Sequence, residues 1–123
     1  MATRDTGRYY EDLARTHLEQ AGLRFITANV NYRFGELDLV MREAEALVFV
    51  EVRYRKGARF GGGVASVTSA KQRRIARAAS AWLATHPRDA TRPCRFDVIA
   101  ISGPETRPEL EWIRNAFTLD DLA

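Results

Sequence analysis

Residues 35–53 read GELDLVMREAEALVFVEVR, and this stretch decides the fold of the chain. It contains one strand-like run, 35–42, and most of a second, 46–55, which is rich in β-branched residues. Two such runs joined by a short polar segment predict a β-hairpin. With the loop centred after residue 44, residues whose numbers add up to 89 face each other, so Leu39 lies opposite Val50.

This register separates the side chains of the hairpin cleanly into two faces. A slip of one residue would mix them, which supports the pairing. One face pairs Glu36 with Arg53 and Asp38 with Glu51. The other face is entirely apolar and consists of Leu37, Leu39, Met41, Val48, Val50 and Val52.

The pair formed by Asp38 and Glu51 needs an explanation. Facing Cβ atoms in a hairpin lie about 4.5–5.5 Å apart, and like charges at that separation are destabilising. A divalent cation with oxygen ligands would neutralise the pair, as Mg²⁺ does when one or two carboxylates hold it. Two structural alternatives are a protonated carboxyl group and an ion-pair network of Glu36, Asp38, Glu51 and Arg53.

The flanking sequence predicts two helices and three further strand segments around the second and third strands. Apolar residues at helical spacing and a following glycine mark the first helix. The resulting order, α-β-β-β-α-β-β, predicts an α/β fold in one domain, 1–123, with a central mixed sheet flanked by helices. The third strand, second helix and fourth strand would form a right-handed parallel crossover. The predicted bounds are Asp5 to Ala21, Leu23 to Val30, Gly35 to Arg42, Ala46 to Arg55, Thr68 to Thr85, Arg95 to Ile101 and Glu109 to Phe117.

Composition narrows the class of protein. The chain has 123 residues, of which 46% are hydrophobic and 28% charged, as expected for one globular domain. No apolar run approaches the roughly 20 residues of a membrane span, and the start lacks the apolar core of a signal peptide. The single Cys94 excludes an internal disulfide, and one cysteine with two histidines gives no zinc-site spacing. We therefore expect a cytoplasmic protein without membrane attachment.

The basic residues are concentrated between Arg53 and Arg95, where Asp89 is the one acidic residue, although the net charge is only +3. Such clustering favours a polyanionic partner, because lysine and arginine displace counterions from phosphates. The alternative is a solvated helix face followed by a basic loop. The candidate nucleic-acid contacts are Arg55, Lys56, Arg59, Lys71, Arg73, Arg74 and Arg77.

Three motifs, taken in order, carry a resemblance to a known superfamily. Glu11, then Gly35-Glu36-Leu37-Asp38, then Phe49-Val50-Glu51-Val52-Arg53 resemble the core of PD-(D/E)xK nucleases, especially archaeal Holliday-junction resolvases. From Gly7 to Ser102 the chain also resembles the YraN-like family of uncharacterised bacterial proteins. The further matching stretches are Tyr10-Glu11, Asn29, Tyr54-Arg55, Phe60-Gly61, Lys71 and Cys94-Arg95-Phe96-Asp97-Val98-Ile99.

The resemblance implies a restriction-endonuclease-like fold and a metal-dependent DNA endonuclease. It implies Mg²⁺ or Mn²⁺ held by Asp38, Glu51 and the backbone carbonyl of Val52. Glu11, whose counterpart in the junction resolvases contributes to the metal site, is a further candidate ligand. The implied partner is DNA, with branched or damaged DNA as candidate substrates, and a homodimer is compatible with the sequence. The candidate catalytic residues are Asp38, Glu51, Arg53, Glu11 and Glu36.

The chain departs from the nuclease pattern at one position, because Arg53 stands where the pattern has lysine. Arginine keeps the positive charge and can bind phosphate through two hydrogen bonds, but it cannot act as a base. Lys71 can lean into the site and replace the missing amine, or it can contact DNA phosphate or nothing. A catalytically inactive DNA-binding module and a protein-interaction module therefore remain alternatives to the nuclease. Asp97 is expected to pair with a basic residue of the second helix, or else to support the metal site.

Overall fold

The computed structural model describes residues 3–55 and 67–118. Its elements follow the predicted order, and their bounds fall within two residues of the prediction. The glycine-rich residues 57–63, which the sequence predicts to be a loop, lie outside the described residues. Neither helix in the described ranges combines the length and apolarity needed to cross a membrane. The elements are α1 (Thr3–Gln20), β1 (Arg24–Tyr32), β2 (Gly35–Glu43), β3 (Ala46–Arg55), α2 (Ser69–Ala84), β4 (Cys94–Ser102) and β5 (Glu109–Phe117).

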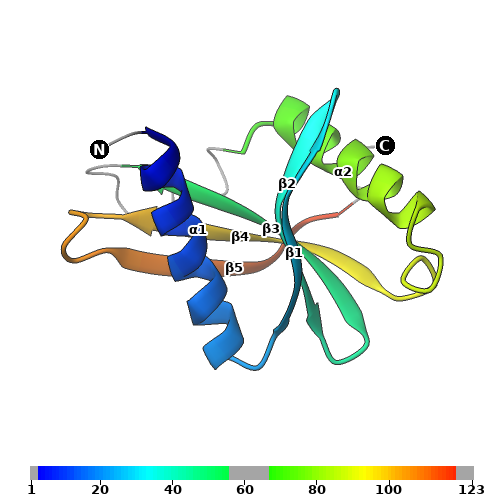
Figure 1. The fold of residues 1–123 in the computed structure, drawn as a ribbon, viewed down its shortest axis with the longest axis horizontal. Helices are drawn as coiled ribbons and strands as arrows, with labels where there is room; N and C mark the ends of the chain where they lie inside the picture. Colours follow the sequence, from blue (N-terminus) through cyan, green and yellow to red (C-terminus); the bar gives the residue numbers. More distant parts are fainter. Residues whose placement is uncertain (1–2, 56–66, 119–123) are drawn as a thin grey trace.

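The strands form one five-stranded sheet in the order β1-β2-β3-β4-β5. All neighbours are antiparallel except β3 and β4, which are parallel and are joined through α2. Figure 1 shows α1 crossing one face of the sheet while α2 lies against the other. The α/β class, the mixed sheet and the parallel crossover are therefore confirmed.

The predicted register of the central hairpin is confirmed over half of its length. Leu39 pairs with Val50, and the pairing continues to the turn in the same register. Beyond Leu39 the pairing of β2 with β3 ends, whereas β2 stays paired with β1 as far as Gly35. The end of β2 therefore leaves the sheet together with β1, and the two rise from it as a twisted ribbon (Figure 1). Two-stranded ribbons twist more strongly than wide sheets.

This divergence corrects one predicted face. Leu39 and Met41 pack in the core under α1, as their alternation requires, but Leu37 belongs to the core under α2. The alternation rule fails at Leu37 because the twist of the ribbon rotates its side chain after β2 has left β3. Leu37 and Val52 are not among the paired residues of the two strands.

The sheet is apolar on both sides, as expected for central strands covered by helices. One core lies between the sheet and α1 and contains the fully buried Ala14 and Leu18. The other lies between the sheet and α2 and contains Phe49, Ile75 and Trp82. Each helix is thereby held in a fixed position over the sheet.

The beginning of α2 is set by a side-chain cap. Thr68 accepts a hydrogen bond from the backbone N of Lys71 at 3.2 Å, which satisfies one of the free N–H groups of the first turn. Serine and threonine are both favoured at this position, and Ser66, which also precedes the helix, lies outside the described residues. The end of α1 is also as predicted, because Gly22 has φ +101°.

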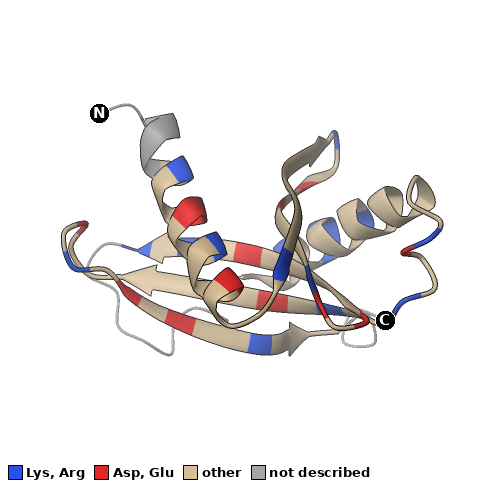
Figure 2. Ribbon diagram, turned by 60° about the horizontal axis from the view of Figure 1, so that its bottom comes forward, with Lys and Arg blue, Asp and Glu red and all other residues tan. Residues whose placement is uncertain are grey.

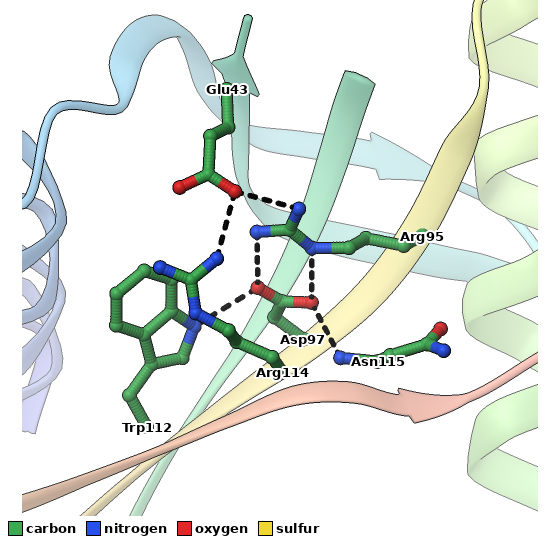
Figure 3. Close-up of polar contacts among 6 residues, drawn as sticks. All are labelled: Glu43, Arg95, Asp97, Trp112, Arg114 and Asn115. Carbon is green, nitrogen blue, oxygen red and sulfur yellow. Dashed lines mark hydrogen bonds and ion pairs between the residues drawn. The ribbon is translucent and has the colours of Figure 1, made fainter.

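Asp97 is fully buried, and its partners differ from those expected. Arg95 donates to both of its oxygens at 3.0 and 3.2 Å, Trp112 Nε1 donates at 2.9 Å, and the backbone N of Asn115 donates at 2.9 Å (Figure 3). No residue of α2 takes part in these bonds, so the preferred prediction is wrong. The reason is a register shift between Phe96 and Val98, which turns β5 so that its backbone faces the carboxylate.

Glu43 extends this network to the end of β2. It accepts hydrogen bonds from Arg95 and Arg114, both at 2.8 Å (Figure 3). The hydrogen bond from Arg114, followed by that from Arg95, lowers the pKa of Glu43 below its ordinary value. The network thus ties β2, β4 and β5 together at the end of the sheet opposite the divergence of β2 from β3.

We predict that Asp97→Asn lowers the free energy of unfolding by roughly 3 kcal/mol, since Arg95 loses one of its two carboxylate partners and the buried amide cannot accept from all the donors around Asp97. Urea denaturation measures this change. Glu45→Gln is the matched control, because that side chain is 79% exposed and its pair with Arg92 should contribute less than about 1 kcal/mol. Equal stability losses in the two variants would contradict the role given to Asp97.

Candidate functional site

The divergence of β2 from β3 opens a cavity of about 250 Å³. Four elements contribute to its walls, namely α1, β2, β3 and α2. All five residues predicted to be catalytic line this one cavity, although they are far apart in the sequence. The lining residues are Gly7, Tyr10, Glu11, Glu36, Asp38, Glu51, Val52, Arg53, Tyr54 and Lys71.

Asp38 lies at the point where the two strands part. Its Oδ2 accepts a hydrogen bond from the backbone N of Val52 at 2.9 Å, so the side chain replaces a partner that the separating strand no longer provides. Burial raises the pKa of Asp38 well above its ordinary range, and the charge and hydrogen bond of Glu51 raise it further. The hydrogen bond from Val52 acts in the opposite direction.

Glu51 is 5% exposed and lies between two cations. Lys71 Nζ is 3.0 Å from its Oε2, and Arg53 Nη1 is 3.7 Å from the same oxygen. Lys71 comes from the first turns of α2, where the Thr68 cap and the packing of Ile75 fix the helix. The Lys71 side chain therefore leans into the site, which was the first of the positions considered for it.

Arg53 carries an unsatisfied donor. Its Nε is buried and has no hydrogen-bond partner among the described residues. A buried N–H without an acceptor costs free energy, on the order of 1–3 kcal/mol. An acceptor that enters the cavity, such as a phosphate oxygen, would remove this cost.

Glu11 and Glu36 occupy other parts of the cavity wall. Glu11 reaches from α1 and is hydrogen-bonded to the side chain of Asn29. Burial raises the pKa of Glu11, and the nearby charge of Glu36 adds to the rise. Glu36 is exposed and forms no ion pair with Arg53 in the described part of the chain. The predicted network is thus wrong in this part, because β2 has turned away from β3 before it reaches Glu36.

The acidic pair is compensated in two ways. Asp38 and Glu51 share a hydrogen bond, which agrees with the protonated carboxyl considered above. Lys71 and Arg53 also neutralise Glu51, as an ion-pair network would, but this network includes Lys71 and not Glu36. The site therefore combines features of both structural alternatives, the protonated carboxyl group and the ion-pair network.

The donor set fits a small divalent cation. Within residues 3–55 and 67–118 no three His, Cys, Asp or Glu side chains are grouped closely enough to form a complete metal site. Asp38 and Glu51 nevertheless provide two adjacent hard oxygen donors, and Val52 lines the same cavity. Two carboxylates suffice for Mg²⁺, which usually completes its shell with water and substrate phosphate.

Two aromatic residues of the site were not predicted as part of it. The rings of Tyr10 and Tyr54 stack with centroids 3.9 Å apart and line the cavity beside the carboxylates. Burial raises the pKa of Tyr10 above the ordinary value of a tyrosine, so its hydroxyl stays protonated at neutral pH. The sequence places Tyr10 only on the buried face of α1, and nothing in the spacing distinguishes it from the other residues of that face.

Within the described residues, the predicted nucleic-acid contacts fall into three groups, and two further contacts lie outside those residues. Arg73, Arg74 and Arg77 are exposed on α2, a helix that carries basic and no acidic residues (Figure 2). Arg55 is exposed at the end of β3. Lys71 belongs to the cavity, as described above. Lys56 and Arg59 lie outside the described residues.

Comparison with known proteins identifies similar chains but no assigned activity. The sequence model of the uncharacterised protein family UPF0102 matches residues 10–101. A UPF0102 protein of Xanthomonas campestris is 58% identical over 120 residues, covering 98% of this chain and 97% of its own. UPF0102 proteins of Yersinia enterocolitica and Yersinia pseudotuberculosis are 56% and 54% identical and are covered in full. These matches confirm the resemblance to the YraN-like family.

We predict that Asp38→Asn raises the free energy of unfolding by roughly 0.5–1 kcal/mol at neutral pH in the presence of EDTA. The amide removes the repulsion from Glu51, while its oxygen still accepts the hydrogen bond from Val52. Thermal unfolding measures the change. Asp12→Asn, which removes the same charge from the exposed side of α1, is the control and should shift the midpoint less. A lower stability of Asp38→Asn than of the control would contradict this electrostatic account.

Proposed function

We propose, from the premise that this chain belongs to the uncharacterised protein family UPF0102, that the protein is a divalent-metal-dependent DNA endonuclease. The observation that carries the proposal is the composition of one cavity. It holds two adjacent carboxyl groups, an ammonium group 3.0 Å from one of them, and a buried guanidinium N–H that has no acceptor within residues 3–55 and 67–118. This combination suits a phosphodiester together with a cation.

Asp38, Glu51 and the carbonyl of Val52 would hold Mg²⁺ or Mn²⁺. The ion supplies Lewis-acid chemistry, since it polarises the scissile phosphate and activates a water molecule. Occupation by a cation would also offset the repulsion between the two carboxylates. Glu11 and Glu36 line the same cavity and would accept hydrogen bonds from water around the ion.

Lys71 and Arg53 together take the role that a single lysine has in the nuclease pattern. The Lys71 ammonium is placed next to Glu51, where it can orient the attacking water and stabilise negative charge on the phosphate. Arg53 would donate its Nε–H to a phosphate oxygen, a role that suits arginine because its guanidinium is a hydrogen-bond donor and not a base. Hydrolysis forms a bond from the water oxygen to phosphorus and breaks one ester bond, whose oxygen leaves with a proton.

The exposed arginines of α2 extend the site for a long polyanion. Arg73 and Arg77 lie on the same helix as Lys71, which reaches into the cavity. A DNA backbone that places one phosphate in the cavity would therefore have further phosphates near this helix. The positive potential of α2 favours such binding without reading the base sequence.

We predict Mg²⁺- or Mn²⁺-dependent cleavage of DNA, to be tested on linear, flapped and four-way substrates. Asp38→Ala should reduce the rate at least about 100-fold, and Lys71→Met by roughly 100- to 1,000-fold. Arg53→Lys combined with Lys71→Met should recover part of the loss, because it returns an amine to the site.

Asp12→Ala is the matched control for the loss of a carboxylate, and it should cleave like the wild type. Equal cutting by wild type and Asp38→Ala would mean that a contaminating nuclease is responsible. Isothermal titration with Mn²⁺ provides a readout independent of cleavage, since binding should be lost in Glu51→Gln.

The second candidate function is a DNA-binding module without catalysis. It is favoured by Arg53, which stands where the nuclease pattern has lysine. Absence of both cleavage and Mn²⁺ binding, together with salt-dependent DNA binding, would select this candidate over the endonuclease.

Both candidates predict DNA binding through α2. In EDTA, the affinity should fall linearly with salt on logarithmic axes, and Arg73→Gln and Arg77→Gln should each reduce the slope by about 1. Fluorescence anisotropy between low and moderate salt measures the slope. Arg24→Gln, an exposed change at the start of β1, is the control and should leave it unchanged. Slopes that ignore the α2 arginines would exclude this interface.

A further inference from the structure

A second and larger cavity, of about 370 Å³, lies beside the candidate site. It is formed by the tip of the β1–β2 hairpin and by α2, and it shares Glu36 and Lys71 with the first cavity. Its volume is within the range of small-molecule sites, which starts at about 300 Å³. The other lining residues are Asn31, Tyr32, Arg33, Phe34, Gly35, Arg74 and Ile75.

The hairpin tip is held tightly against α2. A Cβ atom on Gly35 would lie 2.5 Å from the backbone oxygen of Arg74, so only glycine permits this approach. The two walls of the cavity therefore keep a fixed separation where they meet, and the cavity is a built feature of the fold.

One wall presents aromatic rings. Tyr32 and Phe34 are partly exposed and stack on each other with centroids 5.5 Å apart and planes within 3°. The guanidinium of Arg77 lies 4.7 Å from the centre of the Phe34 ring. Partly exposed aromatic rings combined with arginine form the platforms on which proteins stack unpaired bases.

The charged residues of the cavity suit a phosphate. Arg33, Lys71 and Arg74 line it, and Glu36 is the one acidic residue among its described lining residues. A ligand with both a flat ring and a phosphate can contact the aromatic wall and the basic residues at once, and a nucleotide is such a ligand. In a duplex the bases are stacked and paired, so only an unpaired nucleotide can place its base against Tyr32 and Phe34.

We propose that this cavity binds an unpaired nucleotide next to the phosphodiester held in the candidate site. The base stacks on the platform of Tyr32 and Phe34, and its phosphate lies toward Lys71 and Arg74. The preferred substrate is accordingly DNA with a single-stranded tail or gap at the point of cleavage. This inference rests on the proposed function, because it takes the neighbouring phosphate as the one to be cleaved.

The test measures binding rather than cleavage. Fluorescence anisotropy in EDTA compares a blunt duplex with the same duplex carrying a five-nucleotide tail. The tailed duplex should bind roughly 5- to 100-fold more tightly, and Phe34→Leu should remove this preference while leaving affinity for the blunt duplex unchanged. Phe34→Trp, which keeps a stacking surface, should retain the preference.

Phe25→Leu is the matched control. Phe25, which lies in β1, is likewise partly exposed and lies beneath an arginine, with the Arg15 guanidinium 3.5 Å from its centre, but it lines neither cavity. Its substitution should leave the preference for the tail intact. Thermal unfolding of all variants identifies any loss of folded protein, and Arg74→Gln gives a second, exposed change in the same cavity.

An abasic nucleotide, moved stepwise along the tail, locates the stacked base. At one position it should weaken binding as much as Phe34→Leu does, and the two changes together should cost no more than either alone. Additive effects at every position would overturn the proposed contact. Equal binding of tailed and blunt duplexes would overturn this inference while leaving the endonuclease proposal standing. Failure to bind any DNA would overturn both.

Discussion

The hydrogen bond from the backbone N of Val52 to the carboxylate of Asp38, 2.9 Å long, is the interaction on which the site depends. Beyond Leu39, β2 leaves β3 and follows β1, so the inner edge of β3 loses its regular partner. Asp38 supplies an acceptor at that point. The same side chain thus closes the end of the sheet and forms half of the acidic pair, and the cavity exists because the two strands part there.

The electrostatics of the cavity follow from this geometry. Glu51 lies next to Asp38 and is nearly completely buried, which is unfavourable unless cations are near. Lys71 and Arg53 provide them from two different elements. Arg53 gains little hydrogen bonding in return, since its Nε is left without a partner among the described residues. A buried group that lacks a partner beside two carboxyl groups is typical of a site arranged for a ligand rather than for stability.

The hairpin shows how far prediction from the sequence reaches. The tight loop and the separation of polar from apolar residues predict the register correctly from the turn to Leu39 and Val50. The same rule places Leu37 on the wrong side, because strict alternation holds only while a strand stays in its sheet. For Asp97 the sequence predicts a partner on α2, whereas the irregular pairing of β4 with β5 brings Trp112 and the backbone of Asn115 to it.

The sequence by itself determined the order of elements, the register of the central hairpin near its turn, and the proximity of Asp38 to Glu51, because these follow from local periodicity and one short turn. Only the tertiary structure decided that Lys71 contacts Glu51 and that Tyr32 and Phe34 form a cavity with α2. These contacts depend on where a helix lies over a sheet. That position is set by the packing of Ile75 and Trp82 against the sheet and by the close approach of Gly35 to α2. It cannot be inferred from the periodicity of the sequence.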